Sequence, residues 1–330
     1  MSEFTVFGAG AMGTAMSHLL ACNGHDVFMW ARRKEIADQI NRKRENAEYM
    51  PTLILPENVR ATTSLEECAT TARRMIIAIP SHAVNELCTK LNKHVSSNAY
   101  WLSVVKGMDT RTKCTISELL HNKISVKKDR VATLSGPNFA IEIVNKIPTV
   151  AVIGSQCNST ASLFKRSLTN NYFLITTTND LSGVEISGIL KNIGAIALGI
   201  VDGLNFGDNT RGAIFPIFIK EAFEIGTKIF GAEQYTLLGP AFLGDIITTA
   251  FSDKSRNRVL GLIASKRITN LPIHTFVAEG RNNAEIIRSL AKSRKIKIPI
   301  TEFVYSVLNG TKPFIAFDSM WKQIRELTTL

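Results

Sequence analysis

Two lysines occupy positions from which they could take part in chemistry. One could exchange a proton with a substrate, and the other could polarise a carbonyl group. Lys191 lies within an apolar stretch of helical spacing and is the only basic residue between Arg166 and Arg211. Burial would lower its pKa toward neutrality, which suits proton exchange with a substrate oxygen. A side chain that extends to the surface is an equally good interpretation of the same pattern.

The second lysine, Lys106, follows a predicted strand at residues 100–104. Open α/β sheets bind their ligands at the carboxyl ends of the strands. A cation at that position could polarise a carbonyl and, by repulsion, lower the pKa of another lysine. Taken alone, Lys106 would be interpreted as an ordinary loop lysine.

A third feature is the segment Ser255-Arg256-Asn257-Arg258, which precedes an apolar run and predicts the beginning of a helix. The unpaired N–H groups of a helix N-terminus form a phosphate site when a guanidinium stands beside them. A serine N-cap with solvated arginines is the alternative, and the pattern does not separate the two.

Gly8, Gly10 and Gly13 follow a predicted strand and open a predicted helix, which is the setting of a dinucleotide-binding loop. The first glycine permits a tight turn, the second lets the backbone approach a pyrophosphate, and the third allows close packing of helix on strand. The backbone at Ala11 and Met12 would supply N–H donors. Glycines that merely close a turn are the weaker alternative.

The end of the second predicted strand carries Arg32 and Arg33, with no acidic residue before Glu35. Folds that bind NAD place a carboxylate on the ribose there, whereas those that bind NADP place an arginine on the 2′-phosphate. The sequence therefore predicts that NADP(H) is preferred and that NAD(H) is also accepted. Two arginines at a strand end can also be surface charge alone.

The sequence pattern predicts an α/β fold that would position these groups. It consists of an N-terminal Rossmann-type doubly wound sheet followed by an all-helical C-terminal domain. We expect residues 1–182 to bind the dinucleotide and residues 183–330 to bind substrate and carry catalysis. The predicted strands are residues 4–7, 26–30, 75–79, 100–104, 131–134, 149–153 and 172–176. The predicted helices include residues 12–23, 34–41, 82–92, 113–120, 159–168, 184–201 and 213–230. The apolar stretch 184–201 contains charged and polar residues, which favours a core helix over a membrane span.

Composition narrows the class of protein further. The 330 residues carry a formal charge of +11, which favours anionic partners, but the basic residues are scattered and predict no nucleic-acid surface. The five cysteines are odd in number and form no C-x-x-C pair, so neither a disulfide framework nor a metal site is expected. Residues 1–3 lead directly into a strand and leave no room for a signal peptide. We expect a cytoplasmic protein with no integral membrane segment.

Together these motifs resemble the NAD(P)-dependent glycerol-3-phosphate dehydrogenase family, over nearly the whole chain. The stretches that carry the resemblance are Gly8-Ala9-Gly10-Ala11-Met12-Gly13, Pro80-Ser81-His82, Val105-Lys106-Gly107, Ser135-Gly136-Pro137, Leu190-Lys191-Asn192, Leu243-Gly244-Asp245, Ser255-Arg256-Asn257-Arg258 and Glu279-Gly280.

The resemblance implies reversible hydride transfer between the nicotinamide and C2 of sn-glycerol 3-phosphate, giving dihydroxyacetone phosphate and feeding glycerophospholipid synthesis. It makes Lys191 the proton donor during reduction and Asp245 the carboxylate that orients it. The other residues to which it gives roles near a small phosphorylated substrate are Lys106, Asn192, Thr249, Arg256, Asn257 and Ser135. Those that it places near the cofactor are Pro80, His82, Lys106 and Glu279, with His82 in a loop as a hydrogen-bonding neighbour. A homodimer is expected by analogy.

Some positions depart from the family pattern. Ile141 replaces a common lysine, and Phe242 replaces a usual glycine, where it could narrow the substrate pocket. Arg211 is a candidate for an additional substrate contact. Two alternatives stay open: another two-domain dehydrogenase of the β-hydroxyacid or 6-phosphogluconate type, and a non-catalytic nucleotide-sensing protein.

Overall fold

The computed structural model describes residues 4–71, 73–266 and 279–328, so residues 1–3, at the start of the predicted first domain, lie outside it. The chain forms two compact units. The sheet unit comprises Met1–Val105 and Cys114–Glu185, and the helical unit comprises Lys106–Lys113 and Ile186–Leu330. The sequence placed one boundary near residue 182 and did not anticipate that Lys106–Lys113 would group with the later helices.

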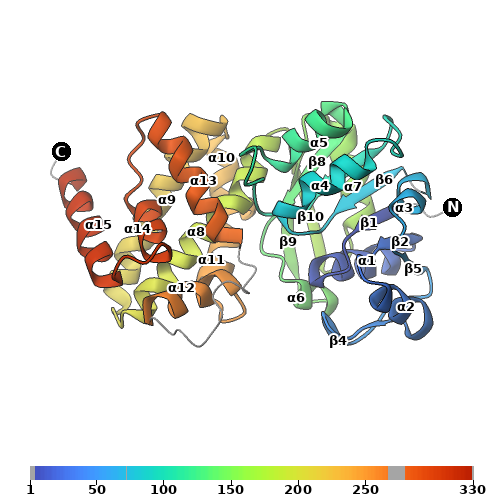
Figure 1. Cartoon of the computed structure of the whole chain (residues 1–330), viewed down its shortest axis with the longest axis horizontal. Coiled ribbons are helices and arrows are strands. Elements are labelled where there is room, and N and C mark those ends of the chain that lie inside the picture. The colour runs from blue at the N-terminus through green and yellow to red at the C-terminus, as the bar shows by residue number, and fades with distance from the viewer. Residues whose placement is uncertain (1–3, 72, 267–278, 329–330) are drawn as a thin grey trace. The chain divides into compact units, whose positions relative to one another are not determined.

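The sheet unit alternates strands and helices along the chain, as Figure 1 shows from blue to green. Its main strands are β1 (Phe4–Phe7), β2 (Val27–Trp30), β5 (Val59–Thr62), β6 (Arg74–Ile77), β7 (Tyr100–Ser103), β8 (Val131–Ser135), β9 (Thr149–Gly154) and β10 (Phe173–Thr178). Its helices are α1 (Ala11–Cys22), α2 (Lys34–Lys43), α3 (Leu65–Thr71), α4 (Ser81–Leu91), α5 (Ile116–Ile124), α6 (Ala140–Val144) and α7 (Asn158–Leu168), with a 3-10 turn η1 (Lys128–Arg130).

The eight strands form one sheet in the order β10-β9-β8-β7-β6-β1-β2-β5. All neighbouring pairs are parallel except β8 and β9. β1 has β2 on one side and β6 on the other, so the chain changes direction across the sheet at β1. Ligands of open α/β sheets bind at the carboxyl ends of the strands at such a switch point. The predicted doubly wound fold is confirmed.

Alternate residues of the central strands β1, β2, β6, β7 and β8 enter two separate cores on opposite faces of this sheet. Phe4, Val6 and Ile76 pack with side chains of α1, α2 and α7. Phe7 and Ile77 pack with side chains of α3, α4 and α5. Because the strands are buried on both faces, they read in the sequence as continuous apolar runs rather than as alternating ones.

Several short elements were absent from the sequence prediction, namely β5, α3, α6 and the small antiparallel hairpin of β3 (Glu45–Asn46) and β4 (Met50–Ile54). Prolines at positions 51 and 56 interrupt the apolar pattern of that region. The predicted helix at residues 113–120 began too early. α5 starts at Ile116 because Thr115 and Glu118 form a reciprocal capping box there.

The helical unit is built from long helices, drawn from yellow-green to red in Figure 1. They are α8 (Leu181–Gly203), which crosses the unit boundary, α9 (Asp208–Phe230), α10 (Gln234–Leu238), α11 (Asp245–Ala250), α12 (Arg256–Lys266), α13 (Glu279–Ser293), α14 (Pro299–Leu308) and α15 (Pro313–Thr328). A π-helical turn, η2 (Pro240–Gly244), precedes α11. The expected all-helical second part is confirmed.

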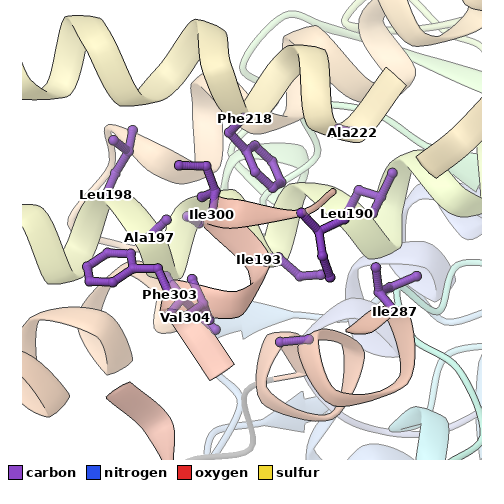
Figure 2. Packing of buried hydrophobic residues seen from close by; sticks show 14 of the residues in the cluster. Leu190, Ile193, Ala197, Leu198, Phe218, Ala222, Ile287, Ile300, Phe303 and Val304 are labelled. Carbon is purple, nitrogen blue, oxygen red and sulfur yellow. The ribbon is translucent and has the colours of Figure 1, made fainter. Parts of the chain in front are cut away.

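α8 is the central helix of this unit. It is long and apolar enough to cross a membrane, and no other described helix meets that test, but its most apolar window is entirely buried inside the protein. Figure 2 shows its side chains packed against neighbouring helices. The labelled residues of this core are Leu190, Ile193, Ala197, Leu198, Phe218, Ala222, Ile287, Ile300, Phe303 and Val304. α8 is therefore a core helix, as its charged and polar residues predicted.

α8 and α12 cross at very short range through two glycines. A Cβ on Gly199 would lie 2.1 Å from the carbonyl oxygen of Arg258, and one on Gly261 would lie 2.2 Å from that of Ile196. Any side chain at either position would collide with backbone. This crossing brings the N-terminal end of α12, which begins at Arg256, close to the middle of α8.

Candidate active site

Lys106, Lys191, Asp245 and Thr249 form a buried cluster in the helical unit, which we call the lysine cluster. Asp245 bridges the two lysines: its Oδ2 accepts from Lys106 Nζ at 2.7 Å and its Oδ1 from Lys191 Nζ at 3.1 Å. Lys191 Nζ also donates to Thr249 Oγ1 at 2.8 Å. Lys191 therefore does not extend to the surface, and that interpretation of the sequence is wrong.

Three separate segments supply these side chains. Lys106 follows β7, and Lys191 lies in the middle of α8. Asp245 is the first residue of α11, directly after η2, where Gly244 N donates to Gly239 O at 3.3 Å. Single π-helical turns change the direction of the chain and occur often at functional sites. Thr249 lies one turn after Asp245, and its hydroxyl is 3.2 Å from Asp245 Oδ1.

Burial and charge together set the protonation of the cluster. Burial lowers the pKa of Lys191 to about 8; the Asp245 carboxylate opposes this shift, and the Lys106 ammonium adds to it. Burial alone would raise the pKa of Asp245, but the ammonium groups of Lys106 and Lys191 bring it below its ordinary value. Lys191 can therefore change protonation state close to neutral pH while Asp245 stays ionised.

Asn192, next to Lys191 on α8, uses both ends of its amide within the protein. Its Nδ2 donates to the Lys106 carbonyl oxygen at 3.0 Å, and its Oδ1 accepts from Asn257 Nδ2 at 2.9 Å. Asn257 Oδ1 in turn accepts from Gly280 N at 3.1 Å. The structure thus joins Asn192 and Asn257 to the lysine cluster through hydrogen bonds, whereas the sequence assigned them to substrate alone.

The N-terminal end of α12 lies beside this cluster. Ser255 Oγ accepts from Arg258 N at 3.2 Å, so the predicted serine cap is present. The Arg256 side chain is exposed and makes no ion pair with any residue that the structure describes. It is close enough to Lys191 to lower the pKa of that lysine. The serine cap is therefore confirmed, and the phosphate site at Arg256 stays a prediction.

The neighbouring arginines have protein partners instead. Asp202 on α8 accepts from Arg258 Nε and Nη2 at 3.0 and 2.7 Å, and from Arg211 Nε at 2.5 Å. Arg258 also pairs with Asp253, and Arg211 pairs with Asp208 at 2.7 Å. Arg211 is therefore held by two carboxylates, and its role as an additional substrate contact stays a prediction. Sequence reasoning missed Asp202, because nothing near it in the sequence indicates these pairs.

In the sheet unit, the glycine loop joins β1 to α1. Gly8 has a φ of +121°, and a Cβ on Gly13 would lie 1.9 Å from Gly8 O, so both positions require glycine. At Gly10 a Cβ would meet nothing within 4 Å, which leaves open space over the N-terminus of α1. The buried Asn46, absent from the sequence prediction, fastens the loop by donating to Ala9 O at 2.8 Å. The loop thus forms a cradle of free N–H groups that fits a pyrophosphate.

The two arginines after β2 differ in their surroundings. Arg32 is exposed and makes no ion pair within the described ranges. Arg33 Nη2 donates to Glu48 Oε2 at 2.6 Å and lies 3.4 Å from the Tyr49 hydroxyl. Of the two guanidiniums, that of Arg32 is the one not already matched by a carboxylate.

The remaining residues that the sequence assigned to the site lie at or near the ends of helices and strands. Pro80 is the N-cap of α4, and His82 is exposed in the first turn of that helix rather than in a loop. Ser135 is the last residue of β8 and is buried, and Glu279 is the first residue of α13. No group of three or more His, Cys, Asp or Glu side chains able to hold a metal occurs among the described residues.

Phe242 and Ile141, the two residues that depart from the family pattern, have different surroundings in the structure. Phe242 is fully buried, with its ring 6.3 Å from that of Phe223 in the core of the helical unit. The suggestion that Phe242 narrows a substrate pocket is therefore wrong, because its side chain fills the core. Ile141 is 40% exposed on α6 in the sheet unit.

Comparison with known proteins matches both parts of the chain. Residues 3–161 match the family model for the NAD-dependent glycerol-3-phosphate dehydrogenase N-terminus, and residues 180–317 match the one for its C-terminus. The glycerol-3-phosphate dehydrogenase [NAD(P)+] of Bacillus pumilus is 35% identical over 98% of this chain and 95% of that relative. The same enzyme of Staphylococcus carnosus is 36% identical over 93% of this chain and 94% of its own. The crystal structure of glycerol-3-phosphate dehydrogenase from Coxiella burnetii superimposes with a TM-score of 0.89 at 28% identity, covering 97% of this chain and 98% of that one.

Proposed function

Because the chain belongs to the NAD-dependent glycerol-3-phosphate dehydrogenase family, we propose that it interconverts dihydroxyacetone phosphate and sn-glycerol 3-phosphate with NAD(P)(H). The observation that carries the proposal is the lysine cluster, in which a buried lysine with a pKa of about 8 is held between a carboxylate and a hydroxyl. Bound NADPH or NADH supplies the hydride that reaches C2 of the ketone.

Lys191 delivers the proton that completes the reduction. Its ammonium has three N–H bonds, of which one goes to Asp245 and one to Thr249, so the third is left for the substrate oxygen. As negative charge develops on that oxygen, the proton moves to it and Lys191 becomes neutral. In the reverse direction neutral Lys191 accepts the hydroxyl proton.

Asp245 and Lys106 support this transfer in different ways. Asp245 orients Lys191 through Oδ1, and its charge is compensated by Lys106 at 2.7 Å. The Lys106 ammonium places positive charge beside the developing oxyanion, which stabilises the transition state. Its repulsion also keeps the pKa of Lys191 near the pH at which both directions can proceed.

The phosphate of the substrate is proposed to bind at the beginning of α12. The exposed guanidinium of Arg256 and the unpaired N–H groups of the first helical turn suit three phosphate oxygens. The Asn257 side chain keeps this end of α12 against α8 through its bond to Asn192. Ser135 is kept as a further substrate contact on the resemblance to the family alone.

The cofactor is proposed to lie over the glycine loop, where the open space at Gly10 and the N–H groups of Ala11, Met12 and Gly13 fit the pyrophosphate. Pro80, His82, Lys106 and Glu279 stay as proposed neighbours of the cofactor. Both NADP(H) and NAD(H) are used, as the names of the relatives imply. A preference for NADP(H) is supported by Arg32, which is free to pair with a 2′-phosphate.

The two alternatives fit the site less well. A β-hydroxyacid or 6-phosphogluconate enzyme is disfavoured because the match to the glycerol-3-phosphate dehydrogenase family covers both parts of this chain. A non-catalytic nucleotide sensor would gain nothing from holding two lysines on one buried carboxylate, because such an arrangement is costly to desolvate.

The assembly and location of the protein are also proposals. A homodimer is supported by exposed apolar side chains of the helical unit, among them Tyr235, Leu238 and Phe251, which are 87%, 56% and 55% exposed. Its mass in solution, measured by light scattering, would test this. A cytoplasmic location is supported by five cysteines that are all free thiols.

The proposed activity is tested by a turnover panel. Oxidation of NADPH is measured with dihydroxyacetone phosphate and with 2-keto and 3-keto acids. The same series is then repeated with NADH in place of NADPH. We expect turnover with dihydroxyacetone phosphate and a higher kcat/KM with NADPH than with NADH. Turnover of the keto acids alone would support the first alternative, and absence of any turnover by folded protein would support the second.

A further inference from the structure

A closed circuit of hydrogen bonds surrounds the backbone of Lys106, and it includes a residue without a role so far. The Lys106 carbonyl oxygen accepts from Asn192 Nδ2 at 3.0 Å and from Asn283 Nδ2 at 3.2 Å. Asn192 binds Asn257, and Asn257 binds Gly280 N. Gly280 and Asn283 lie one turn apart on α13, so the circuit closes through that helix. The circuit thus ties together four segments: α8, α12, α13 and the segment that begins at Lys106.

Asn283 takes part in this circuit as a donor. It is fully buried, and its Nδ2 also donates to the carbonyl oxygen of Ile189 on α8 at 3.2 Å. Its Oδ1 has no partner among the side chains and backbone that the structure describes. Two carbonyl oxygens converge on one end of the amide, and only an N–H or O–H group can satisfy them. The contribution of this side chain is therefore its NH₂ group.

Asn283 connects two parts of the chain that lie far apart in the sequence. It links α13 to a carbonyl 177 positions earlier in the chain, directly beside the lysine that reaches Asp245. A second contact joins the same helix to the same segment: Lys113 Nζ donates to Ser289 Oγ at 2.8 Å. That contact is exposed, whereas the Asn283 contact is partly buried and lies at the start of the segment. The chain thus offers a matched pair of anchors, one of which is next to Lys106.

We propose that Asn283 is a positioning residue for the reaction, which holds the Lys106 backbone so that the Lys106 ammonium stays on Asp245 and beside Lys191. The proposal deepens the proposed function and rests on it. Asn283 itself touches neither substrate nor cofactor. Its amide restricts the position of the Lys106 Cα atom, and the length of the side chain then places Nζ on Asp245 Oδ2.

The consequence appears at Lys191. The charged groups that act on it are Asp245 on α11, Lys106 in the preceding segment and Arg256 on α12. When Lys106 is released, Lys191 loses a repelling cation, and the Asp245 carboxylate is less occupied and attracts Lys191 more strongly. Both changes stabilise the ammonium form, so both raise the pKa of Lys191 from about 8.

The test is the pH dependence of kcat for reduction of dihydroxyacetone phosphate at saturating NADPH. Protonated Lys191 is required in this direction, so kcat of the natural protein falls as the pH rises through about 8. Asn283→Leu removes the donor while keeping the number and branching of the side-chain heavy atoms. We expect the fall of kcat at alkaline pH, which is the alkaline limb of the profile, to move to a higher pH by about half a pH unit or more. The maximum kcat should also be lower. Ser289→Ala, which removes the exposed anchor, should leave the limb in place.

A limb that stays at the natural pH in Asn283→Leu would overturn the proposal, even if kcat falls, because a purely structural role lowers the amount of active enzyme at every pH. If that variant does not fold, as judged by thermal melting, Asn283→Ala takes its place with the same expected shift. Asn283→Thr keeps a hydroxyl donor and should return the limb toward its natural position.

A second measurement separates this proposal from the proposed function. If the natural protein does not turn over dihydroxyacetone phosphate, the proposed function fails, and the titration of Lys191 is followed instead by NMR of ¹³C-methylated lysines. An upward shift of that titration in Asn283→Leu supports the positioning role. An unchanged titration overturns it.

Discussion

Exchanging Asp245 for asparagine removes the one anion of the lysine cluster while preserving its shape. Asp245 stands 2.7 Å from Lys106 Nζ and 3.1 Å from Lys191 Nζ, so Asp245→Asn leaves two buried ammonium groups facing a neutral amide. In the natural protein the carboxylate raises the pKa of Lys191 against the effect of burial. Without it, all the remaining influences, namely burial and the charges of Lys106 and Arg256, lower that pKa.

The size of the effect follows from these contacts. An opposite charge at such a distance is worth about one to three pKa units, so we expect the pKa of Lys191 to fall from about 8 to about 6. At pH 7.5 the ammonium form then falls from roughly three-quarters of the molecules to roughly 3%. Reduction of dihydroxyacetone phosphate should therefore slow about 25-fold at pH 7.5 from this cause alone.

The assay is kcat for reduction between pH 5 and 9. The Asp245→Asn variant should regain activity as the pH is lowered toward 5.5, which a damaged active site would not do. Asp253→Asn is the matched control, because Asp253 is exposed and pairs with Arg258 outside the cluster. An alkaline limb that stays near pH 8 or moves upward in Asp245→Asn would refute the electrostatic reasoning.

Three further changes test other parts of the account. Arg256→Ala should raise the KM for dihydroxyacetone phosphate by about 10-fold to 100-fold, as expected for a lost charge-assisted hydrogen bond, and an unchanged KM would contradict the phosphate role. Glu48→Gln releases Arg33 from its ion pair and should strengthen NADPH binding by up to about fivefold without changing NADH binding, measured as Kd by fluorescence. Equal effects on both cofactors would argue against a 2′-phosphate contact. Burial raises the pKa of Glu221 from 4.5 to about 7, so its contribution to stability is fully present below about pH 4.5 and is lost as the pH rises through about 7. Between pH 5 and 8 the thermal midpoint should therefore fall more steeply for the natural protein than for Glu221→Gln, and parallel curves would be inconsistent with that shift.

The two lysines could be singled out as candidate site residues from the sequence, because the signals are local. Lys191 stands in an apolar helix and Lys106 at the end of a strand, and each pattern is visible within a few residues. The same holds for the glycine loop, whose order of strand, glycines and helix is contiguous. The predicted repulsion between the two lysines is confirmed by its effect on the pKa of Lys191.

What the sequence could not provide is the set of long-range contacts. Asp245 meets Lys191 across 54 positions, and Asn283 meets Lys106 across 177. Asp245 entered the prediction only through resemblance to a family, and Asn283 did not enter it at all. Both are polar residues of helices whose neighbours in the sequence do not show that the side chain is buried, since burial there depends on how the helices pack.

The same limit explains the error at Phe242. A phenylalanine in place of a glycine suggested a narrower pocket, but the π-helical turn directs its ring into the core. The bond from Arg211 to Asp202, nine positions earlier in the chain, was likewise not visible in the sequence. Residue types could be read from the sequence, whereas the directions of these side chains could not.

The central claim is that Lys191 supplies the proton when dihydroxyacetone phosphate is reduced, and Lys191→Ala tests it most directly. We expect kcat to fall by about 10² to 10⁴ while the Kd for NADPH, measured by fluorescence on the same protein, stays unchanged. Lys220→Ala, an exposed lysine of α9, is the matched control and should behave as the natural protein does. A kcat for Lys191→Ala within a few fold of the natural value would contradict the account.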